Sequence, residues 1–252
     1  MNFTDELSGL ERQQVRYAFY YRRRDQAPVL IANAGRFRSA SMIKVPILLA
    51  WLELERAGLV SGAEDCDLDA EPQVQGAGFS WLMRARRQPY DDLLLMMIAL
   101  SDNLATNLVI RRAGLERLQE TIRAACGLSG VALQRKLMDY EARARGLENS
   151  LTVQDAIHMY ATLRGLPEAD RRRAEAMLEV NQDAALLCRD HPRDTVVFRH
   201  KTGSMEGILH DWGYTDEVDL FLFTEGIRDE PAAFEVFGRL GRLLLEPPAP
   251  GL

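Results

Sequence analysis

The chain has 252 residues, which is enough for one large hydrophobic core or for two subdomains. Hydrophobic residues make up 47% of it and charged residues 27%, the balance of an ordinary globular protein. The net charge of −6 offers no basis for binding nucleic acid or an anionic membrane. The longest apolar run, residues 93–100, is too short to span a bilayer. We therefore expect neither nucleic-acid nor membrane partners.

The N-terminus and the cysteines bear on compartment and cofactors. Residues 1–14 are acidic and polar and lack the apolar region of a secretory signal, so we expect a cytoplasmic protein, or an exported one if a leader has been removed. Cys66, Cys126 and Cys188 are far apart and form no C-x-x-C, which argues against a disulfide framework. The four histidines also lack metal-binding spacing, so we expect no metal and no cofactor.

The predicted elements alternate between strands at the ends and helices in the middle. Residues 4–14 predict a helix, and aromatic and β-branched residues predict strands at 15–23 and 27–35. Helical patterns then follow at 41–58, 90–100, 104–114, 152–165 and 167–181. The chain closes with strand patterns at 194–203 and 217–226, a helix at 230–246 and the proline-rich tail 247–252.

This order predicts an α/β fold. Strands from the two ends of the chain are expected to meet in one antiparallel sheet flanked by the terminal helices, with the middle inserted as an all-helical subdomain. We place the α/β subdomain at 1–36 and 185–252 and the helical subdomain at 37–184. A cleft between the two subdomains is where a site is expected.

Lysine is scarce, which draws attention to Lys44. Only three lysines occur, and the remaining 28 basic residues are arginine. Ser41 stands three residues before Lys44 at a predicted helix start, so the two side chains share a face. A neutral lysine amine can take the serine proton, and the helix N-terminus stabilises the developing alkoxide. Ser41 is therefore a candidate nucleophile and Lys44 its base.

The tripeptide Ser101–Asn103 interrupts a helical run. Ser101 is a candidate proton relay to a leaving group, and Asn103 is a candidate for binding a substrate amide and orienting Lys44. Asp102 is expected to be structural, bonding backbone amides at the break. Taken alone, this pattern is equally typical of a helix N-cap.

The tripeptide Lys201–Gly203, followed by Ser204, ends a predicted strand. Lys201 is a candidate for binding a substrate carboxylate, and its charge would push Lys44 toward the neutral state. Gly203 would let a ligand lie close to the strand edge. The backbone N–H groups of Ser204 and Ser41 are candidates for an oxyanion hole. Alone, this pattern predicts only a turn.

Together the three patterns are far more specific, because their joint appearance in this order by chance is on the order of 10⁻⁵. S-x-x-K, S-D-N and K-T-G are the signature of class A serine β-lactamases and related penicillin-binding proteins, which this chain resembles from about Val29 to Phe223. The flanks FRSASMIK, MMIALSDNLATNLVI and HKTGSMEGILHDWG strengthen the resemblance.

The resemblance implies the β-lactamase fold and an acyl-serine mechanism acting on a small molecule, either a β-lactam or a peptide-like amide. It implies that Ser41 is acylated, that Lys44 activates it and that Ser101 relays the proton. Asn103, Lys201, Thr202, Gly203 and Ser204 would bind substrate. We expect a monomer.

One feature of the family is missing. Class A β-lactamases carry E-x-x-L-N, whose glutamate activates the deacylating water, and this chain has no such pattern after Arg135. Anchored on Arg135, the expected glutamate falls at Leu137. The nearby acids are Asp139, Glu141 and Glu148; Glu141 is our candidate for a substitute base, although a surface role fits it as well. We therefore expect slow deacylation.

The sequence also allows other interpretations of the site. The pair His210–Asp211 could form a triad with Ser41, but there is no G-x-S-x-G elbow. Residues 75–78, QGAG, predict a loop bordering the cleft rather than a nucleotide site. The same Ser–Lys machinery would also serve a peptidase, an esterase or a glutaminase, or a sensor that stays acylated.

Overall fold

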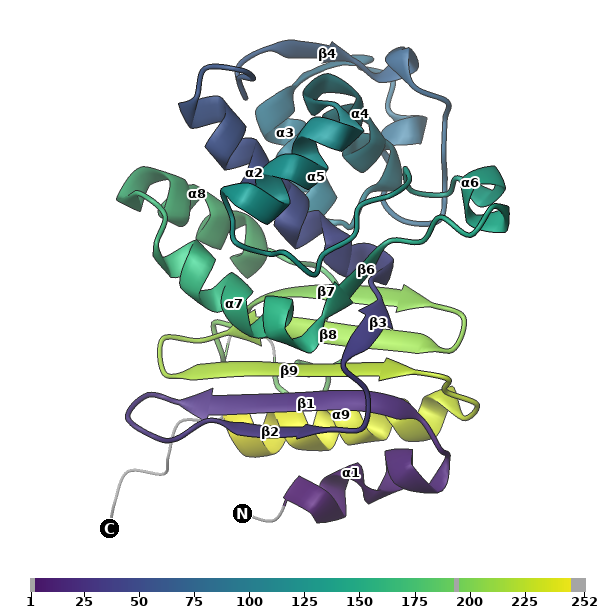
Figure 1. Ribbon diagram of the computed structural model, residues 1–252, viewed down its shortest axis with the longest axis vertical. Helices are drawn as coiled ribbons and strands as arrows, with labels where there is room; N and C mark the ends of the chain where they lie inside the picture. Colours follow the sequence, from purple (N-terminus) through teal and green to yellow (C-terminus); the bar gives the residue numbers. More distant parts are fainter. Residues whose placement is uncertain (1–2, 193–194, 246–252) are drawn as a thin grey trace.

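A five-stranded antiparallel sheet separates two helical layers in the computed structural model, which describes residues 3–192 and 195–245 (Figure 1). The strand order is β2-β1-β9-β8-β7, so the first two strands of the chain pair with the last three. The strands are β1 (Arg16–Arg23), β2 (Val29–Ala32), β7 (Arg199–Met205), β8 (Ile208–Tyr214) and β9 (Val218–Glu225). This arrangement leaves β7 at one edge of the sheet.

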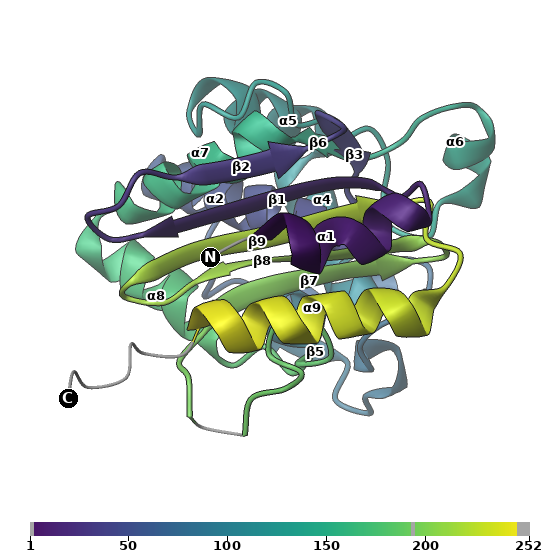
Figure 2. The ribbon, with the colours of Figure 1, turned by 90° about the horizontal axis from the view of Figure 1, so that it is seen from below.

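The alternation along β1 decides what each face of the sheet contacts. Tyr17, Phe19 and Tyr21 belong to the hydrophobic cluster beneath the terminal helices, whereas Ala18 and Tyr20 belong to the cluster of the helical middle. The terminal helices α1 (Phe3–Arg12) and α9 (Glu230–Leu245) lie across the first face (Figure 2). The second face carries the other helices.

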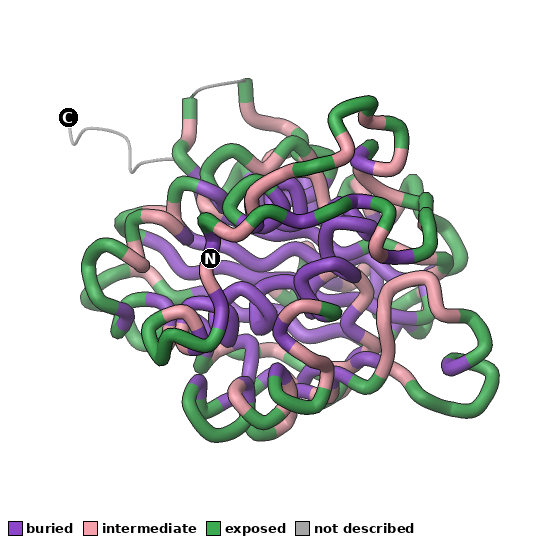
Figure 3. Tube along the Cα trace, turned by 90° about the horizontal axis from the view of Figure 1, so that it is seen from above, coloured by how far each residue is buried: buried purple, intermediate pink, exposed green. Residues whose placement is uncertain are grey.

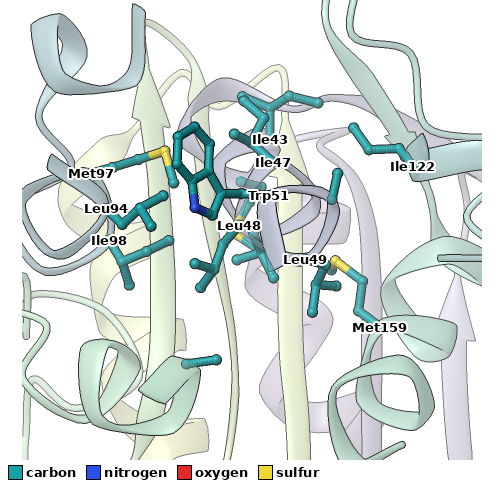
Figure 4. Close-up of a cluster of buried hydrophobic side chains, with 14 of the residues drawn as sticks. Ile43, Ile47, Leu48, Leu49, Trp51, Leu94, Met97, Ile98, Ile122 and Met159 are labelled. Atoms are coloured by element: carbon teal, nitrogen blue, oxygen red, sulfur yellow. The ribbon is translucent and has the colours of Figure 1, made fainter. Parts of the chain in front are cut away.

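The helical layer is built around α2 (Lys44–Arg56), which follows the 3-10 turn η1 (Ala40–Ile43). Ten of its thirteen residues are buried, as expected of a helix that is apolar all round and lies in the core. Trp51, Ile47 and Leu48 pack there against side chains of the neighbouring helices (Figure 4). Those neighbours are α3 (Tyr90–Ala99), α4 (Asn103–Ala113), α5 (Leu115–Ala124), α7 (Val153–Arg164) and α8 (Glu168–Glu179).

Shorter elements complete this layer. They are the strand pairs β3 (Arg36–Arg38) with β6 (Ser150–Thr152) and β4 (Asp65–Asp67) with β5 (Arg87–Pro89), the turns η2 (Leu68–Ala70) and η3 (Ser80–Leu82), and helix α6 (Tyr140–Ala144). The buried chain runs through the middle of the molecule, and exposed residues concentrate in the outer turns (Figure 3).

The helical layer is fixed to the sheet by an aromatic contact. Tyr160 on α7 stacks on Trp212 of β8 with ring centroids 4.6 Å apart. The Tyr160 hydroxyl donates to the Gly213 carbonyl at 3.1 Å, and Trp212 Nε1 donates to the Ala156 carbonyl at 2.8 Å. Each buried polar group of this aromatic pair is therefore satisfied, so packing and hydrogen bonding together set how the helices sit on the sheet.

The predicted fold class is confirmed, and three details are corrected. Strand β8 was not predicted, because His210, Asp211 and Gly213 interrupt the apolar run by which a strand buried on both faces is recognised. Strand β7 begins at Arg199 rather than Asp194, which lies outside the described residues, as does the tail 247–252. The middle also contains the short strands β4, β5 and β6. The subdomain boundaries at 36/37 and 184/185 stay a prediction.

Among the described residues, no helix is both long enough and apolar enough to cross a membrane.

Candidate active site

A cavity of about 1220 Å³ lies between the β7 edge of the sheet and the helical layer. It brings together residues from all three sequence patterns, and Gly76 and Gly78 line it as predicted for the 75–78 loop. The lining residues used below are Ser41, Phe79, Ser101, Asn103, Arg135, Leu137, Glu148, Asn149, Asp183, Thr202, Ser204 and Glu206. The cavity therefore lies beside residues that all three sequence patterns single out.

Ser41 lies in η1, directly before α2. The Ser39 backbone holds this turn: its N–H donates to the Asn149 carbonyl, and its carbonyl accepts from the Met42 N–H, both at 2.9 Å. Strand β7 runs close beside it, since a Cβ on Gly203 would come 3.0 Å from Met42 N and 3.2 Å from the Ser39 carbonyl. A side chain at 203 would therefore crowd the protein's own turn, which would have to shift by a few tenths of an ångström.

Lys44 is fully buried beneath Ser41 and faces four oxygen atoms. Its Nζ lies 3.0 Å from Ser41 Oγ, Ser101 Oγ and Asn103 Oδ1, and 2.5 Å from the Ser101 carbonyl. The carbonyl and amide oxygens can only accept hydrogen bonds, whereas the hydroxyls can also donate. A neutral amine has two N–H groups for the two obligate acceptors, which leaves its lone pair for the Ser41 proton.

The electrostatics favour that neutral state. Burial is the main cause that lowers the pKa of Lys44 well below its ordinary value, and the positive charge of Lys201 lowers it further. The carboxylate of Asp102 acts in the opposite direction. Burial also lowers the pKa of Lys201 to about 8, while Asp183 and Asp211 oppose that shift. The proton affinity of Lys44 is therefore set by its surroundings.

The Ser101–Asn103 segment is held by its middle residue. Asp102 caps α4 by accepting from Ala105 N–H at 2.9 Å, and it also accepts from the N–H groups of Phe79 and Ser80, each at 2.8 Å. This is the structural role that the sequence predicted for Asp102. Ser101 sits at φ 55°, a conformation that usually takes glycine or asparagine. This strained backbone conformation directs both the carbonyl and the hydroxyl of Ser101 toward Lys44.

The Lys201–Ser204 segment differs in part from expectation. Thr202 and Ser204 line the cavity. Lys201 does not, because it is fully buried and its Nζ donates to the Thr202 carbonyl at 2.7 Å. The Thr202 hydroxyl already donates to Asp183 Oδ2 at 2.7 Å. The binding roles of these residues, and the oxyanion hole at Ser41 and Ser204, stay predictions.

The candidate deacylating acids lie apart from this centre. Glu141 is exposed on α6, which projects from the body of the protein, and it does not line the cavity (Figure 2). Asp139 caps α6 by accepting from the Ala142 N–H at 2.8 Å. Glu148 does line the cavity, but its Oε1 pairs with Arg135 at 2.5 Å. The assignment of Glu141 as the base stays a prediction, and its position gives it no support.

The His210–Asp211 pair does not face Ser41. His210 Nε2 donates to the Arg38 carbonyl at 2.8 Å, and Nδ1 accepts from the Thr224 N–H at 3.2 Å. Burial lowers the pKa of this imidazole to about 4, so it is neutral at ordinary pH. Asp211 instead lies 3.0 Å from His200. Both ring nitrogens of His210 are thus committed to the backbone, and the triad reading is wrong.

Two site residues were missed in the sequence. Asn107 on α4 holds Leu137 at the cavity wall: its Oδ1 accepts from the Leu137 N–H at 2.8 Å, and its Nδ2 donates to the Leu137 carbonyl at 3.0 Å. Asp183, bound to Thr202, is the second. Asn107 lies one helical turn after Asn103, which was a usable signal. No local pattern marked Asp183.

No metal centre emerges from the part of the chain that the structure describes, because no group of three His, Cys, Asp or Glu side chains there could hold an ion. The three cysteines are free thiols, and burial raises the pKa of each. A thiol whose pKa is raised is a poor nucleophile at neutral pH. Ser41 is thus the better candidate for acylation.

The family model of the β-lactamase enzyme family matches residues 2–247, so the chain belongs to this family. Membership makes it a serine hydrolase of the β-lactamase and penicillin-binding-protein kind. None of the curated proteins compared with the chain matches it.

Solved structures agree with the family in fold. A β-lactamase from Sphaerobacter thermophilus has a TM-score of 0.84 and 25% identity, with 95% of this chain and 93% of that chain covered. An ancestral class A β-lactamase has a TM-score of 0.83 and 21% identity, covering 96% and 98%. A leucine-to-glutamate variant of PBP-A, solved as an acyl-enzyme complex with penicillin G, has a TM-score of 0.83 and 20% identity, covering 96% and 94%.

Proposed function

We propose that the protein transfers the acyl group of a β-lactam or a related amide or ester to Ser41 and releases it slowly. The observation that carries this proposal is the position of the buried Lys44 Nζ, 3.0 Å from Ser41 Oγ and from Ser101 Oγ. A base within hydrogen-bond reach of a hydroxyl activates it as a nucleophile, and the second hydroxyl can pass the proton on.

The acylation step follows from this geometry. Neutral Lys44 takes the Ser41 proton as Ser41 Oγ bonds to the carbonyl carbon. The carbon–nitrogen bond then breaks, and the proton returns through the Ser101 hydroxyl to the leaving nitrogen. Asn103 keeps Lys44 in place through Oδ1, while its Nδ2 donates to the Gln75 carbonyl at 2.9 Å. The product is an ester on Ser41.

Slow deacylation is supported by the acids around the cavity. Hydrolysis of the ester needs a base beside a water molecule. Of the acids that line the cavity, Glu148 is paired with Arg135, Asp183 is bound to Thr202, and Glu206 is exposed in the turn between β7 and β8. At the position anchored on Arg135 stands Leu137, which has no titratable group. The acyl-enzyme is therefore expected to persist.

The test is the intact mass of the protein over time after mixing with a penicillin, a chromogenic cephalosporin and a neutral phenylacetyl ester, beside Ser41→Ala. An adduct that is absent from Ser41→Ala supports the proposal. A decaying adduct with continued product release identifies a true hydrolase, and a persistent one identifies a penicillin-binding sensor. No Ser41-dependent adduct with any of the three compounds would overturn the proposal. Glu141→Gln then tests the substitute base: slower decay would support it, and unchanged decay would remove Glu141 from the mechanism.

A further inference from the structure

Asp183 places a carboxylate in the wall of the cavity. Asp183 Oδ2 accepts the Thr202 hydroxyl at 2.7 Å, so that hydroxyl is not free to donate to a ligand. Lys201, the expected partner of a substrate carboxylate, is fully buried and donates to the Thr202 carbonyl. The polar groups expected to receive an anion are therefore already committed inside the protein.

Asp183 is held in place rather than free to swing away. Its Oδ1 accepts from the Ala185 N–H at 3.3 Å, and its own N–H donates to Asn181 Oδ1 at 2.8 Å. Asn181 Nδ2 in turn donates to the carbonyls of Ile98 on α3 and His200 on β7, at 3.3 and 3.2 Å. The segment that carries Asp183 is thus tied to both walls of the cavity.

The charges around Asp183 compensate for it only in part. Lys201 attracts Asp183, which raises the Lys201 pKa, but Lys201 is fully buried, donates to the Thr202 carbonyl and does not line the cavity. Across the described residues, no ion pair joins Asp183 to a lysine or arginine. Glu206, also in the cavity lining, adds a second acid in the β7–β8 turn. The arginine that lines this end, Arg38, is paired through Nε with Glu225 at 2.7 Å. A substrate carboxylate placed beside Thr202 would meet like charge, which is strongly unfavourable.

We infer that Asp183 makes the sheet end of the cavity a subsite for a cationic or uncharged hydrogen-bond donor, so that the preferred acyl donors carry an ammonium or amide group in the leaving portion rather than a carboxylate. This inference rests on the proposed function, because it concerns the leaving group of the same acyl transfer. An ammonium or amide N–H can donate to Asp183, whereas a carboxylate cannot.

Three thioesters of phenylacetic acid test the inference: those of thioglycolate, thioglycolamide and thiocholine, whose leaving groups are anionic, neutral and cationic. Each rate is divided by the rate of the same ester with hydroxide, because the charge also changes how readily the thiol leaves. In each, the Ser41 Oγ–carbon bond forms and the carbon–sulfur bond breaks, and the Ser41 proton leaves with the thiol by way of Lys44. The rate of Ser41 acylation is followed by intact mass, with Ser41→Ala to subtract any acylation of the cysteines. The thiocholine and thioglycolamide esters should react at least about tenfold faster than the thioglycolate ester.

Asp183→Asn should remove this preference while the thioglycolamide rate stays within about threefold, because the side chain keeps its shape and loses its charge. Glu206→Gln is the matched control: it removes a negative charge from the cavity lining without touching Thr202, and it should leave most of the preference. Thermal unfolding of both variants checks that they fold. Equal rates for the three esters with the wild type, or an unchanged preference in Asp183→Asn, would overturn the inference alone. No Ser41-dependent adduct with any ester would overturn the proposed function and the inference together.

Discussion

Asn107 fastens Leu137 to the wall of the cavity through both ends of its amide, with Oδ1 accepting from the Leu137 N–H and Nδ2 donating to the Leu137 carbonyl. The backbone at 137 is therefore fixed by α4, whatever side chain it carries. Leu137 lines the cavity that contains Ser41, so a glutamate at this position would place its carboxylate in that cavity, on a backbone that α4 already holds.

Leu137→Glu should convert slow release of the acyl group into turnover. A general base typically contributes about 10²- to 10⁴-fold, and we expect a gain in the deacylation rate toward the lower end of that range. The measurement is the decay of the Ser41 adduct by intact mass, with Leu137→Gln as a control of equal size and no basic group. An equal gain in Leu137→Gln would show that space for water, not a base, limits the reaction.

Lys44→Arg should abolish acylation although it preserves the positive charge, because a guanidinium does not release its proton near neutral pH. We expect a loss of about 10²-fold or more in the acylation rate. Lys136→Arg is the matched control, since Lys136 pairs with Glu71 away from Ser41. In the wild type the lowered pKa of Lys44 predicts that acylation rises with pH as the amine becomes neutral, well below pH 10.5. Normal labelling of Lys44→Arg would remove Lys44 from the mechanism.

Asp102→Ala should destabilise the protein strongly, because it leaves the buried N–H groups of Ser80 and Ala105, and the partly buried one of Phe79, without their acceptor. We expect a loss of about 3 kcal/mol in the free energy of unfolding, measured by urea denaturation. Asp139→Ala removes the cap of the short helix α6 and should cost only about 1 kcal/mol. Similar losses in the two variants would contradict the bracing role of Asp102.

His210 should make the protein less stable in mild acid. Its folded-state pKa, about 4, lies below the ordinary value of 6.5, so the unfolded chain binds more protons between these pH values. The free energy of unfolding should therefore fall as the pH drops from 6.5 toward 4, by at most about 3 kcal/mol from this group. His210→Gln keeps a donor for the Arg38 carbonyl and should flatten this part of the pH profile. An unchanged slope would assign the acid sensitivity to other groups.

The sequence by itself determined the parts of this protein that depend on local pattern. Aromatic and β-branched residues predicted β1, the apolar run of residues 41–58 predicted the core helix, and the order of the elements predicted the antiparallel sheet. The three short motifs predicted that Ser41, Lys44, Ser101 and Asn103 would meet, because their chemistry is rare in combination. Strand β8 was missed because it contains the buried polar residues His210 and Asp211. Such residues are tolerated in a buried strand only where distant groups satisfy them, and the sequence does not show those partners.

Only the tertiary structure decided the properties that arise from residues far apart in the chain. The effect of Lys201 on Lys44 was expected from the sequence, but burial, the main cause of the lowered pKa of Lys44, follows from the packing of distant residues around it. On α6, Tyr140 and Arg143 line the cavity whereas Glu141 is exposed and does not. The approach of residues 181–185 to β7 brings Asp183 onto the Thr202 hydroxyl. Solvent exclusion and charge pairing act through space, so they become readable only once the chain has folded.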